Sequence, residues 1–250
     1  MTWRLVALHI DANDPLGLAR FWATALRWTI AEPTVTDEAA TTVRLVPTDG
    51  TPFEIQFGSV AEHKTSQNRI HFDLTTTSLD DQEHSVRSLL ALGARHVDIG
   101  QSPGEAHVVL ADPEGNEFCV IEPTNSFLAK CERLGAVNCD GTQALGYFWS
   151  AVLGWPLVWD QDEETAIRAP GGIGPLITWS GPPLMPRIGK DRVRFHIASG
   201  PEDDPLSELD RLIALGATLV DGGGRDDERM DMADPDANVI RVLSRRSNDA

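Results

Sequence analysis

The sequence is poor in basic residues relative to acidic ones. Its 250 residues include 21 Lys and Arg against 38 Asp and Glu, which gives a formal net charge of −17. Proteins that bind nucleic acid or anionic membranes gather Lys and Arg to displace counterions. The composition therefore argues against nucleic-acid and membrane partners. We interpret the excess of acid as an aid to solubility.

Long apolar runs and paired cysteines are missing as well. No apolar segment approaches the ~20 residues of a membrane-spanning helix. Residues 1–5 lack the charged, apolar and small-residue sections of a signal peptide. The three cysteines, Cys119, Cys131 and Cys139, contain no CxxC pair, which is typical of reduced thiols. The chain also has no P-loop and no dinucleotide-binding glycine motif, and we predict a cytoplasmic protein.

Four blocks of sequence occur twice in the same order. A Phe-Trp pair with another Trp six residues on stands at residues 21–28 and again at 148–155. The blocks RIHF, LLALGA and ADPEGN return as RVRF, LIALGA and ADPDAN, and all offsets lie between 122 and 127 residues. Such regular spacing indicates a duplicated chain. We predict one domain over residues 1–124 and a second over residues 132–246.

Each half also divides into two similar units. The first unit begins with alternating residues typical of a strand, and Asp14-Pro15 is a typical helix start. The order repeats from Arg69, with a second helix that Gly93 is expected to end. We predict βαβββ modules over residues 1–60 and 66–124 and, by the duplication, four modules in all. The expected strands are 4–11, 29–35, 42–47, 52–58, 69–76, 95–99, 106–111 and 117–122, and the second helix is 79–92.

The modules and their motifs resemble a known superfamily. The block DPEGNEFC at residues 112–119, the strand NRIHFD at 68–73 and the Phe-Trp helix are similar to the glyoxalase/bleomycin-resistance/dioxygenase (vicinal oxygen chelate) superfamily. The likeness is greatest to its actinobacterial glyoxalase-like domains, and it covers nearly the whole chain. It implies an α+β fold in which tandem βαβββ modules, four in total, form two eight-stranded glyoxalase-like half-barrel domains. Each would surround a pocket for a small organic molecule.

The first half contains a symmetric set of possible metal ligands. In this superfamily a His or Gln from a first strand and a Glu from a last strand hold a divalent ion, which polarises vicinal oxygens of the substrate. Here each first strand carries a His-x-Asp pair and each last strand a Glu: His9, Asp11, His71 and Asp73, with Glu54 and Glu117. If the two modules pair about a pseudo-twofold axis, one cavity receives His9, Glu54, His71 and Glu117.

The register of the superfamily implies a different set. Its ligand positions fall on Ala7, Gln56, His71 and Cys119. Alanine has no donor atom and glutamine is a weak ligand, so we expect no cofactor, with a divalent Zn, Ni, Fe or Mn ion as the alternative. Cys119 has no base beside it in sequence, which favours a small core residue over a nucleophile.

The second half lacks carboxylates and imidazoles at the corresponding positions. His71 and Cys119 align with Arg194 and Arg241, and His196 follows Arg194 on the same strand face. Two guanidinium groups in one cavity repel unless an anion or an acidic side chain lies between them. We therefore predict either a site for an anionic ligand or salt bridges to nearby acids.

A bound ligand is expected to contact residues of both halves. The predicted ligand-binding set is Gln56, Cys119, Trp179, Arg194, His196 and Arg241. Thr178 and Trp179 are neighbours on one expected strand, so only one of the two faces the pocket. An aromatic wall would suit a flat organic ligand.

Three functions are compatible with these residues. We favour a small-molecule-binding protein of the glyoxalase/bleomycin-resistance kind without the full metal site. The second is a metal-dependent lyase, isomerase or dioxygenase for a vicinal-oxygen substrate, similar to lactoylglutathione lyase or to dioxygenases. The third is a metal-free enzyme that uses His9 with Asp11, or His71 with Asp73, as an acid–base pair. We expect a monomer whose tandem domains imitate a dimer, with a homodimer as the alternative.

Overall fold

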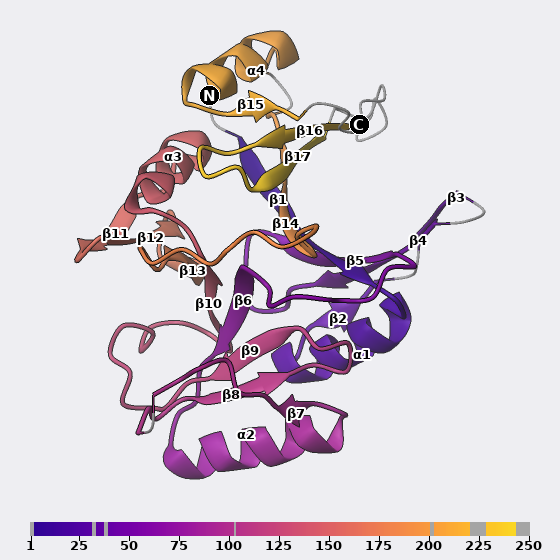
Figure 1. Ribbon diagram of the computed structural model, residues 1–250, viewed down its shortest axis with the longest axis vertical. Coiled ribbons are helices and arrows are strands. Elements are labelled where there is room, and N and C mark those ends of the chain that lie inside the picture. Colours follow the sequence, from indigo (N-terminus) through magenta and orange to yellow (C-terminus); the bar gives the residue numbers. More distant parts are fainter. Residues whose placement is uncertain are drawn as a thin grey trace.

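Two large mixed β-sheets and four helices make up the described chain (Figure 1). The computed structural model describes residues 3–31, 34–37, 40–102, 104–200, 203–220 and 229–243. The arrangement confirms the predicted α+β class. Within these residues no helix is long and apolar enough to cross a membrane.

The first sheet draws its nine strands from both ends of the chain. Its order is β15-β16-β17-β14-β1-β5-β4-β2, with β3 paired to β4. The N-terminal strands are β1 (Arg4–Ala12), β2 (Thr29–Ile30), β3 (Thr34–Asp37), β4 (Ala40–Val46) and β5 (Glu54–Ser59). The C-terminal strands are β14 (Val193–Ala198), β15 (Thr218–Leu219), β16 (Arg229–Ala233) and β17 (Val239–Leu243).

The second sheet contains eight strands from the middle of the chain, in the order β11-β12-β13-β10-β6-β9-β8-β7. Its first group is β6 (Ile70–Leu74), β7 (Arg95–His96), β8 (Val108–Ala111) and β9 (Glu117–Val120). Its second group is β10 (Leu134–Cys139), β11 (Leu157–Gln161), β12 (Glu164–Ala169) and β13 (Ile173–Trp179).

Modules pair across the two sequence halves rather than within them. At the centre of the first sheet β1 lies antiparallel to β14, with His9 opposite Arg194. At the centre of the second sheet β10 lies antiparallel to β6, with Asn138 opposite His71. The pairing of both modules of one half around one cavity is therefore wrong, because each first strand pairs with a strand of the other half. The division at residues 1–124 and 132–246 stays a prediction about the repeat.

Local signals set the limits of the four helices. The Asp14 side chain accepts a hydrogen bond from the Gly17 N–H at the start of the first helix, as its N-cap position predicts. Beyond the second helix, Gly93 has φ +103°, a left-handed conformation that glycine adopts without steric cost. The helices are α1 (Pro15–Leu26), α2 (Leu79–Ala91), α3 (Gln143–Leu153) and α4 (Pro205–Ala214).

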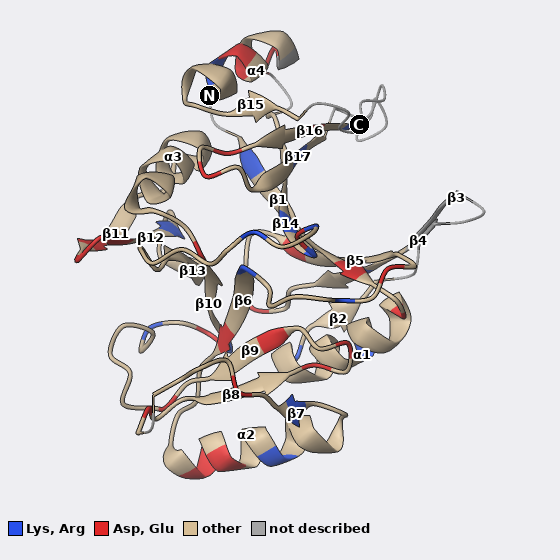
Figure 2. Ribbon diagram, in the orientation of Figure 1, with Lys and Arg blue, Asp and Glu red and all other residues tan. Residues whose placement is uncertain are grey.

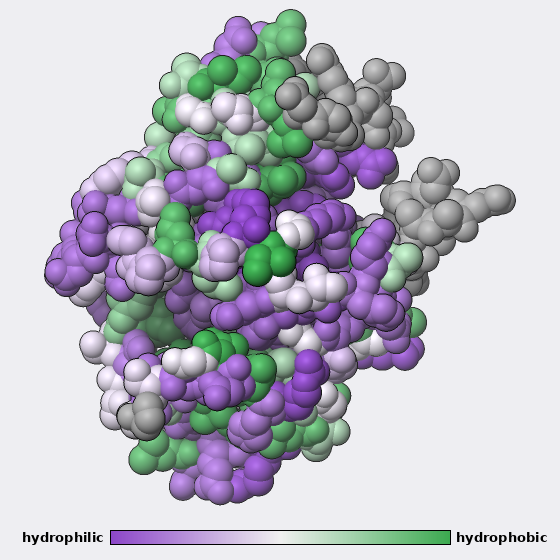
Figure 3. Space-filling view, viewed as in Figure 1, coloured by the Kyte–Doolittle hydropathy of each residue, from purple (hydrophilic) through white to green (hydrophobic). Residues whose placement is uncertain are grey.

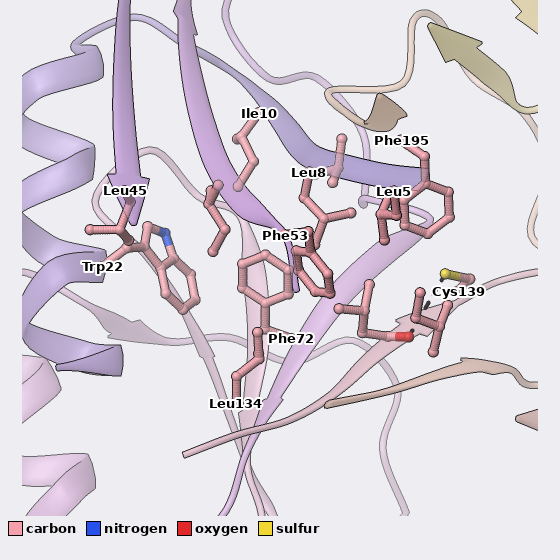
Figure 4. Close-up of a cluster of buried hydrophobic side chains, with 14 of the residues drawn as sticks. Leu5, Leu8, Ile10, Trp22, Leu45, Phe53, Phe72, Leu134, Cys139 and Phe195 are labelled. Carbon is pink, nitrogen blue, oxygen red and sulfur yellow. Dashed lines mark hydrogen bonds between the residues drawn. The ribbon is translucent and has the colours of Figure 1, made fainter. Parts of the chain in front are cut away.

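Aromatic side chains of α1 and α3 join the two modules of each half. The Trp22 ring of α1 meets Phe72 and Phe118 of the second sheet at centroid distances of 5.0 and 5.1 Å. In the other half the Trp149 ring of α3 meets Phe195 of the first sheet at 4.9 Å. Edge-on aromatic pairs of this kind add to the stability from apolar burial. Figure 4 shows this core between the sheets, with side chains of β1 directed toward those of β6 and β10.

The repeated Asp-Pro turn fastens each half together. Asp112 is fully buried and accepts a hydrogen bond of 3.0 Å from the Trp22 indole N–H. The Glu114 carboxylate accepts the Asn13 backbone N–H just before α1, at 2.9 Å. In the second half Asp236 accepts the backbone N–H of the N-cap residue of α3, at 2.7 Å. The motif that carries the family resemblance is therefore structural in this chain.

Two connections pass between the sheets. Residues 60–69 run from β5 to β6, and residues 180–192 run from β13 to β14, and we call them the two crossings. The Ser66 hydroxyl donates to the Ile188 carbonyl at 3.0 Å, so the crossings lie side by side (Figure 1).

Candidate functional site

One face of the second sheet carries a row of polar side chains. His71 of β6 lies opposite Asn138 of β10, which lies opposite Thr178 of β13. Two residues after His71 on β6, Asp73 lies beside Cys119 of β9. Opposed residues of neighbouring strands share a face, as do residues two apart on one strand. We call these five residues the second-sheet site.

Three side chains of the second-sheet site converge. The donor atoms of His71, Asp73 and Cys119 lie within 4.8 Å of one another. His71 Nε2 is 3.5 Å from Asp73 Oδ1, and the His71 side chain is 27% exposed. Burial lowers the pKa of His71, but the hydrogen bond to Asp73 and the charges of Asp73 and Glu117 outweigh it and raise that pKa above its ordinary value. His71 is thus an accessible imidazole whose proton is held by an acid.

Cys119 behaves as a core residue. Its residue is 6% exposed, and burial, with the nearby Asp73 charge, raises the pKa of the Cys119 thiol well above its usual range. A protonated thiol is a poor nucleophile. This supports the structural interpretation of Cys119 over a catalytic one.

Apolar side chains cover the floor beside the polar row. Leu128, from the segment after β9, packs with Cys119 in a buried cluster. The other members are Val109, Ile121, Ala136 and Leu176, with Val97 and Ile99 against them. Figure 3 shows a hollow at the left of this face, beside β10–β13, with hydrophobic surface in its depth. Cys119 is therefore enclosed by apolar side chains, whereas the His71 side chain keeps partial exposure.

The matching face of the first sheet carries a different set. His9 of β1 lies opposite Arg194 of β14, and His196 lies opposite Arg241 of β17. Asp11 follows His9 on the same face. We call these five residues the first-sheet cluster. The structure thus brings together Arg194, His196 and Arg241, as the sequence predicted for one cavity.

Ion pairs occupy both arginines of this cluster. Arg194 Nη2 donates to Asp11 Oδ1 at 2.6 Å, and Lys190 Nζ lies 2.8 Å from the other Asp11 oxygen. Arg241 Nε donates to Asp231 Oδ1 at 2.7 Å. Of the two alternatives left open by the sequence, salt bridges to nearby acids are the arrangement present.

The two histidines of the cluster are held neutral. Their rings stack with centroids 4.7 Å apart and planes 18° apart. Burial and the charges of His9, Arg241 and Arg194 lower the pKa of His196 to about 2. Burial and Arg194 also lower the pKa of His9, against the pull of Asp11. Burial alone would raise the pKa of Asp11, but hydrogen bonds from His9, Arg194 and Lys190 leave it well below its usual range.

The His9 ring fits because its neighbour on β5 has no side chain. Gly58 lies beside Asp11 in the parallel pairing of β1 and β5. A Cβ added at Gly58 would lie only 2.5 Å from His9 Cε1. The first-sheet cluster is therefore closely packed as well as charge-paired.

Comparison with known proteins identifies the family. A model of the glyoxalase-like domain family matches residues 7–121 and again residues 135–243. The chain belongs to this family. A comparison with curated proteins found no match.

Solved structures with the same fold include glyoxalase I from Zea mays, with a TM-score of 0.68 and 13% identity over 97% of this chain and 92% of that one. They also include a putative dioxygenase from Bacillus subtilis, with a TM-score of 0.64 and 14% identity over 96% of this chain and 84% of that one. At such identities these likenesses support the fold.

The predicted metal set of a glyoxalase-like domain is divided between the two sheets. His9 and Glu54 lie on β1 and β5 of the first sheet, while His71 and Glu117 lie on β6 and β9 of the second. Because the modules pair across the halves, these four side chains do not form one site. The prediction of a single site with these four ligands is therefore wrong.

Both glutamates of that set already have cationic partners. Arg44 donates to the Glu54 carboxylate through Nε and Nη2, at 2.7 to 3.0 Å, and Gln56 donates to Glu54 at 2.6 Å. Lys64 Nζ lies 2.6 Å from Glu117 Oε1. Gln56 lies opposite His9 in the first sheet, apart from the second-sheet site.

A divalent metal of the kind that glyoxalase-like relatives use fits the two faces unequally. In the first sheet such an ion would meet the cations Arg194 and Arg241, which repel it. In the second sheet His71, Asp73 and Cys119 offer nitrogen, oxygen and sulfur donors close enough for one ion. Binding would require Cys119 to lose its proton. The described residues therefore fit a metal only at the second-sheet site.

Of the two neighbours on β13, Thr178 occupies the polar face. Trp179 is 1% exposed and belongs to the main core. The structure thus places Trp179 away from His71, because Thr178 pairs with Asn138. The Thr178 hydroxyl is buried and has no hydrogen-bond partner in the described part of the chain.

Sequence reasoning missed Asn138 and Lys190. Asn138 stands two residues after Ala136, the position aligned with His9, so strand parity could have found it. Lys190 lies in a crossing with no regular pattern, and no signal in the sequence connects it with Asp11.

Proposed function

We propose that this protein binds a small organic molecule at the second-sheet site, without the complete metal-ligand set of metal-using relatives. One observation carries the proposal: the partly exposed His71 stands beside Asn138 and Thr178 at the edge of a buried apolar floor. Small-molecule pockets are mainly apolar, with a few placed polar groups that fix orientation.

Each polar group has a distinct part in this proposal. Asp73 holds the proton and orientation of the His71 ring, which faces the ligand. The Thr178 hydroxyl, which has no partner within the ranges that the structure describes, donates to or accepts from the ligand. Apolar contact comes from the Leu128 cluster. This arrangement suits an amphipathic ligand with one polar edge.

Ligand screening by NMR tests the proposal. We expect hits from a library of small organic molecules to perturb the His71 ring resonances. The affinity of a hit should fall about tenfold in Thr178→Val, since a lost hydrogen bond to a buried group costs about 1–3 kcal/mol. Arg44→Ala, in the other sheet, is the matched control and should bind normally. Hits that bind equally to wild type and to both His71→Ala and Thr178→Val would contradict the proposal.

A metal-dependent lyase, isomerase or dioxygenase is the second candidate, because three donor atoms converge on one point. If it is correct, His71, Asp73 and Cys119 would hold the ion, which would act as a Lewis acid. Elemental analysis after growth with Zn, Ni, Fe and Mn, without chelator or tag, separates the two. One ion per chain that is lost in both His71→Ala and Cys119→Ser would establish this candidate. If no metal were found above background, the small-molecule-binding protein would remain the favoured function.

We further propose a cytoplasmic monomer. Both central strand pairs, β1 with β14 and β6 with β10, are completed within one chain. Pairing that could join two single-domain chains is therefore satisfied internally.

A further inference from the structure

A cavity of about 300 Å³ lies beneath the two crossings. Its lining comes from both sequence halves and includes Lys64 and Arg69 of one crossing and Ile188 and Lys190 of the other. It does not include His71, so it is separate from the second-sheet site. Its volume is at the lower end of the range for small-molecule pockets, roughly 300–1,000 Å³.

The cavity has an apolar part built from both sheets. Ile70 of β6 and Trp179 of β13 come from the second sheet, while Phe195 of β14 and Ile240 of β17 come from the first. Three of these four side chains, all but Ile70, are buried in the protein. A hydrocarbon or aromatic body would find continuous apolar contact here.

Most charges in the cavity wall are paired one to one. Arg69 binds Asp140 at 2.8 Å, and Arg192 binds Glu114 at 2.8 Å. Lys64 binds Glu117, and Asp191 binds Arg187. Figure 2 shows several basic positions along the crossings in the middle of the face. The pairs leave no net charge for a ligand to neutralise.

Asp11 is the exception, because two cations share its single carboxylate. Arg194 and Lys190 bind opposite oxygens of Asp11, which leaves one positive charge at this end of the cavity. The Lys190 side chain is 68% exposed and can turn toward a ligand. The remaining acids are Glu62, which is exposed at the mouth, and Asp234, which accepts hydrogen bonds within its own turn.

We propose that this cavity binds a small amphipathic monocarboxylate, such as a medium-chain fatty acid or an arylalkanoic acid. Its carboxylate lies beside Lys190 and Arg194, and its apolar body lies against Ile70, Trp179 and Phe195. One anionic group matches the local excess of positive charge beside Asp11, where two cations share one carboxylate.

Calorimetric titration with octanoate and octanamide tests this proposal. The two probes share an apolar body and differ in charge. We expect octanoate to bind the wild type at least tenfold more tightly than octanamide. Lys190→Gln should lower the affinity for octanoate three- to tenfold and leave the affinity for octanamide unchanged. Lys130→Gln, which removes an exposed lysine that does not line the cavity, is the matched control.

Two further variants locate the binding. Val239→Phe narrows the cavity at a half-buried lining position and should lower the affinity for both octanoate and octanamide. His71→Ala should leave octanoate affinity unchanged, so the failure of the second-sheet proposal would not affect this one. Equal affinity for octanoate and octanamide, or no octanoate binding, would overturn the proposal. If His71→Ala abolished octanoate binding while Val239→Phe left it unchanged, the ligand would be assigned to the second-sheet site.

Discussion

The two half-barrels are built from the same modules, yet among the described residues His71 of the second-sheet site is partly exposed, whereas His9 and His196 of the first-sheet cluster are buried. In the first sheet the charges of Asp11 and Arg194 are paired in a buried cluster beside the stacked, neutral rings of His9 and His196. In the second sheet His71 remains partly exposed, and the Thr178 hydroxyl two strands away has no hydrogen-bond partner among the described residues. The fold fixes where a ligand can lie, but the residues decide whether the place is available.

The difference arises from a few substitutions at equivalent strand positions. Where the second sheet has Asn138 opposite His71, the first sheet has Arg194 opposite His9. The arginine brings a charge that must be paired once it is buried, and Asp11 supplies the partner. Pairing then draws the side chains together and closes the face. The first-sheet cluster is consequently expected to matter for stability, and the second-sheet site for binding.

Removing Arg194 should have the largest effect on stability. Arg194→Ala leaves the buried Asp11 with Lys190 and the neutral His9, and breaking a buried ion pair costs about 3–5 kcal/mol. Urea unfolding measures the loss. Arg44→Ala breaks the more exposed pair with Glu54 and should cost less than about 1 kcal/mol. Similar losses in the two variants would remove the distinction between a closed cluster and a surface pair.

Crowding the His9 ring should have the second-largest effect on stability. Gly58→Ala places a methyl group against the His9 ring, and overpacking of this kind costs up to about 3 kcal/mol. The same substitution in a His9→Ala background should cost much less, because the ring is gone. Unfolding of the four proteins of this double-mutant cycle gives the coupling. Purely additive losses would show that the ring does not rest on Gly58.

Acid should weaken the first sheet through its histidines. Because the pKa of folded His196 is lowered to about 2, its neutral form stabilises the fold fully above pH 6.5 and progressively less below it. The contribution of Asp234 to the pH dependence of stability has the opposite sign, since burial raises the pKa of Asp234 to about 6. Comparison of His196→Gln with wild type cancels the Asp234 contribution.

Between pH 7 and 5 the wild type should therefore lose about 2 kcal/mol more than the His196→Gln variant. Denaturant unfolding at several pH values checks this difference. An identical pH dependence in the two proteins would show that His196 is hydrated and free to take up a proton.

Changing His71 should affect stability least. His71→Gln keeps a polar partner for Asp73 at a partly exposed position, so we expect a loss below about 1 kcal/mol. Thermal unfolding without ligand measures it. A loss as large as that of Arg194→Ala would mean that His71 is structural and that the two faces are alike.

The sequence predicts local structure well in this chain. Asp14 begins α1, Gly93 follows α2, and the βαβββ order appears as expected in the second, third and fourth modules. The first module has one strand more than predicted, because the expected strand 29–35 is divided into β2 and β3. These features depend on neighbouring residues, whose conformational preferences act over a few positions. The repeat and the family resemblance then give the fold class.

The pairing of modules is not readable in the same way. Nothing near His9 indicates that its strand pairs with one about 185 residues later rather than with a strand of its own half. The metal set was predicted wrongly for this reason, and the Arg194–Asp11 pair was not foreseen. The choice between Thr178 and Trp179 likewise depended on strand register, which shifts every side chain to the other face when it slips by one.

Histidine-selective NMR titration from pH 8 to 5 tests the contrast between the two faces most directly. The ring resonances of His9, His71 and His196 can be assigned with single His→Gln variants. We predict that His71 takes up a proton with a pKa above its ordinary value of 6.5, that the pKa of His9 lies below that value, and that His196 stays neutral throughout. If His9 or His196 became charged near pH 6 while His71 did not, the open face would be that of the first sheet, and the account would be contradicted.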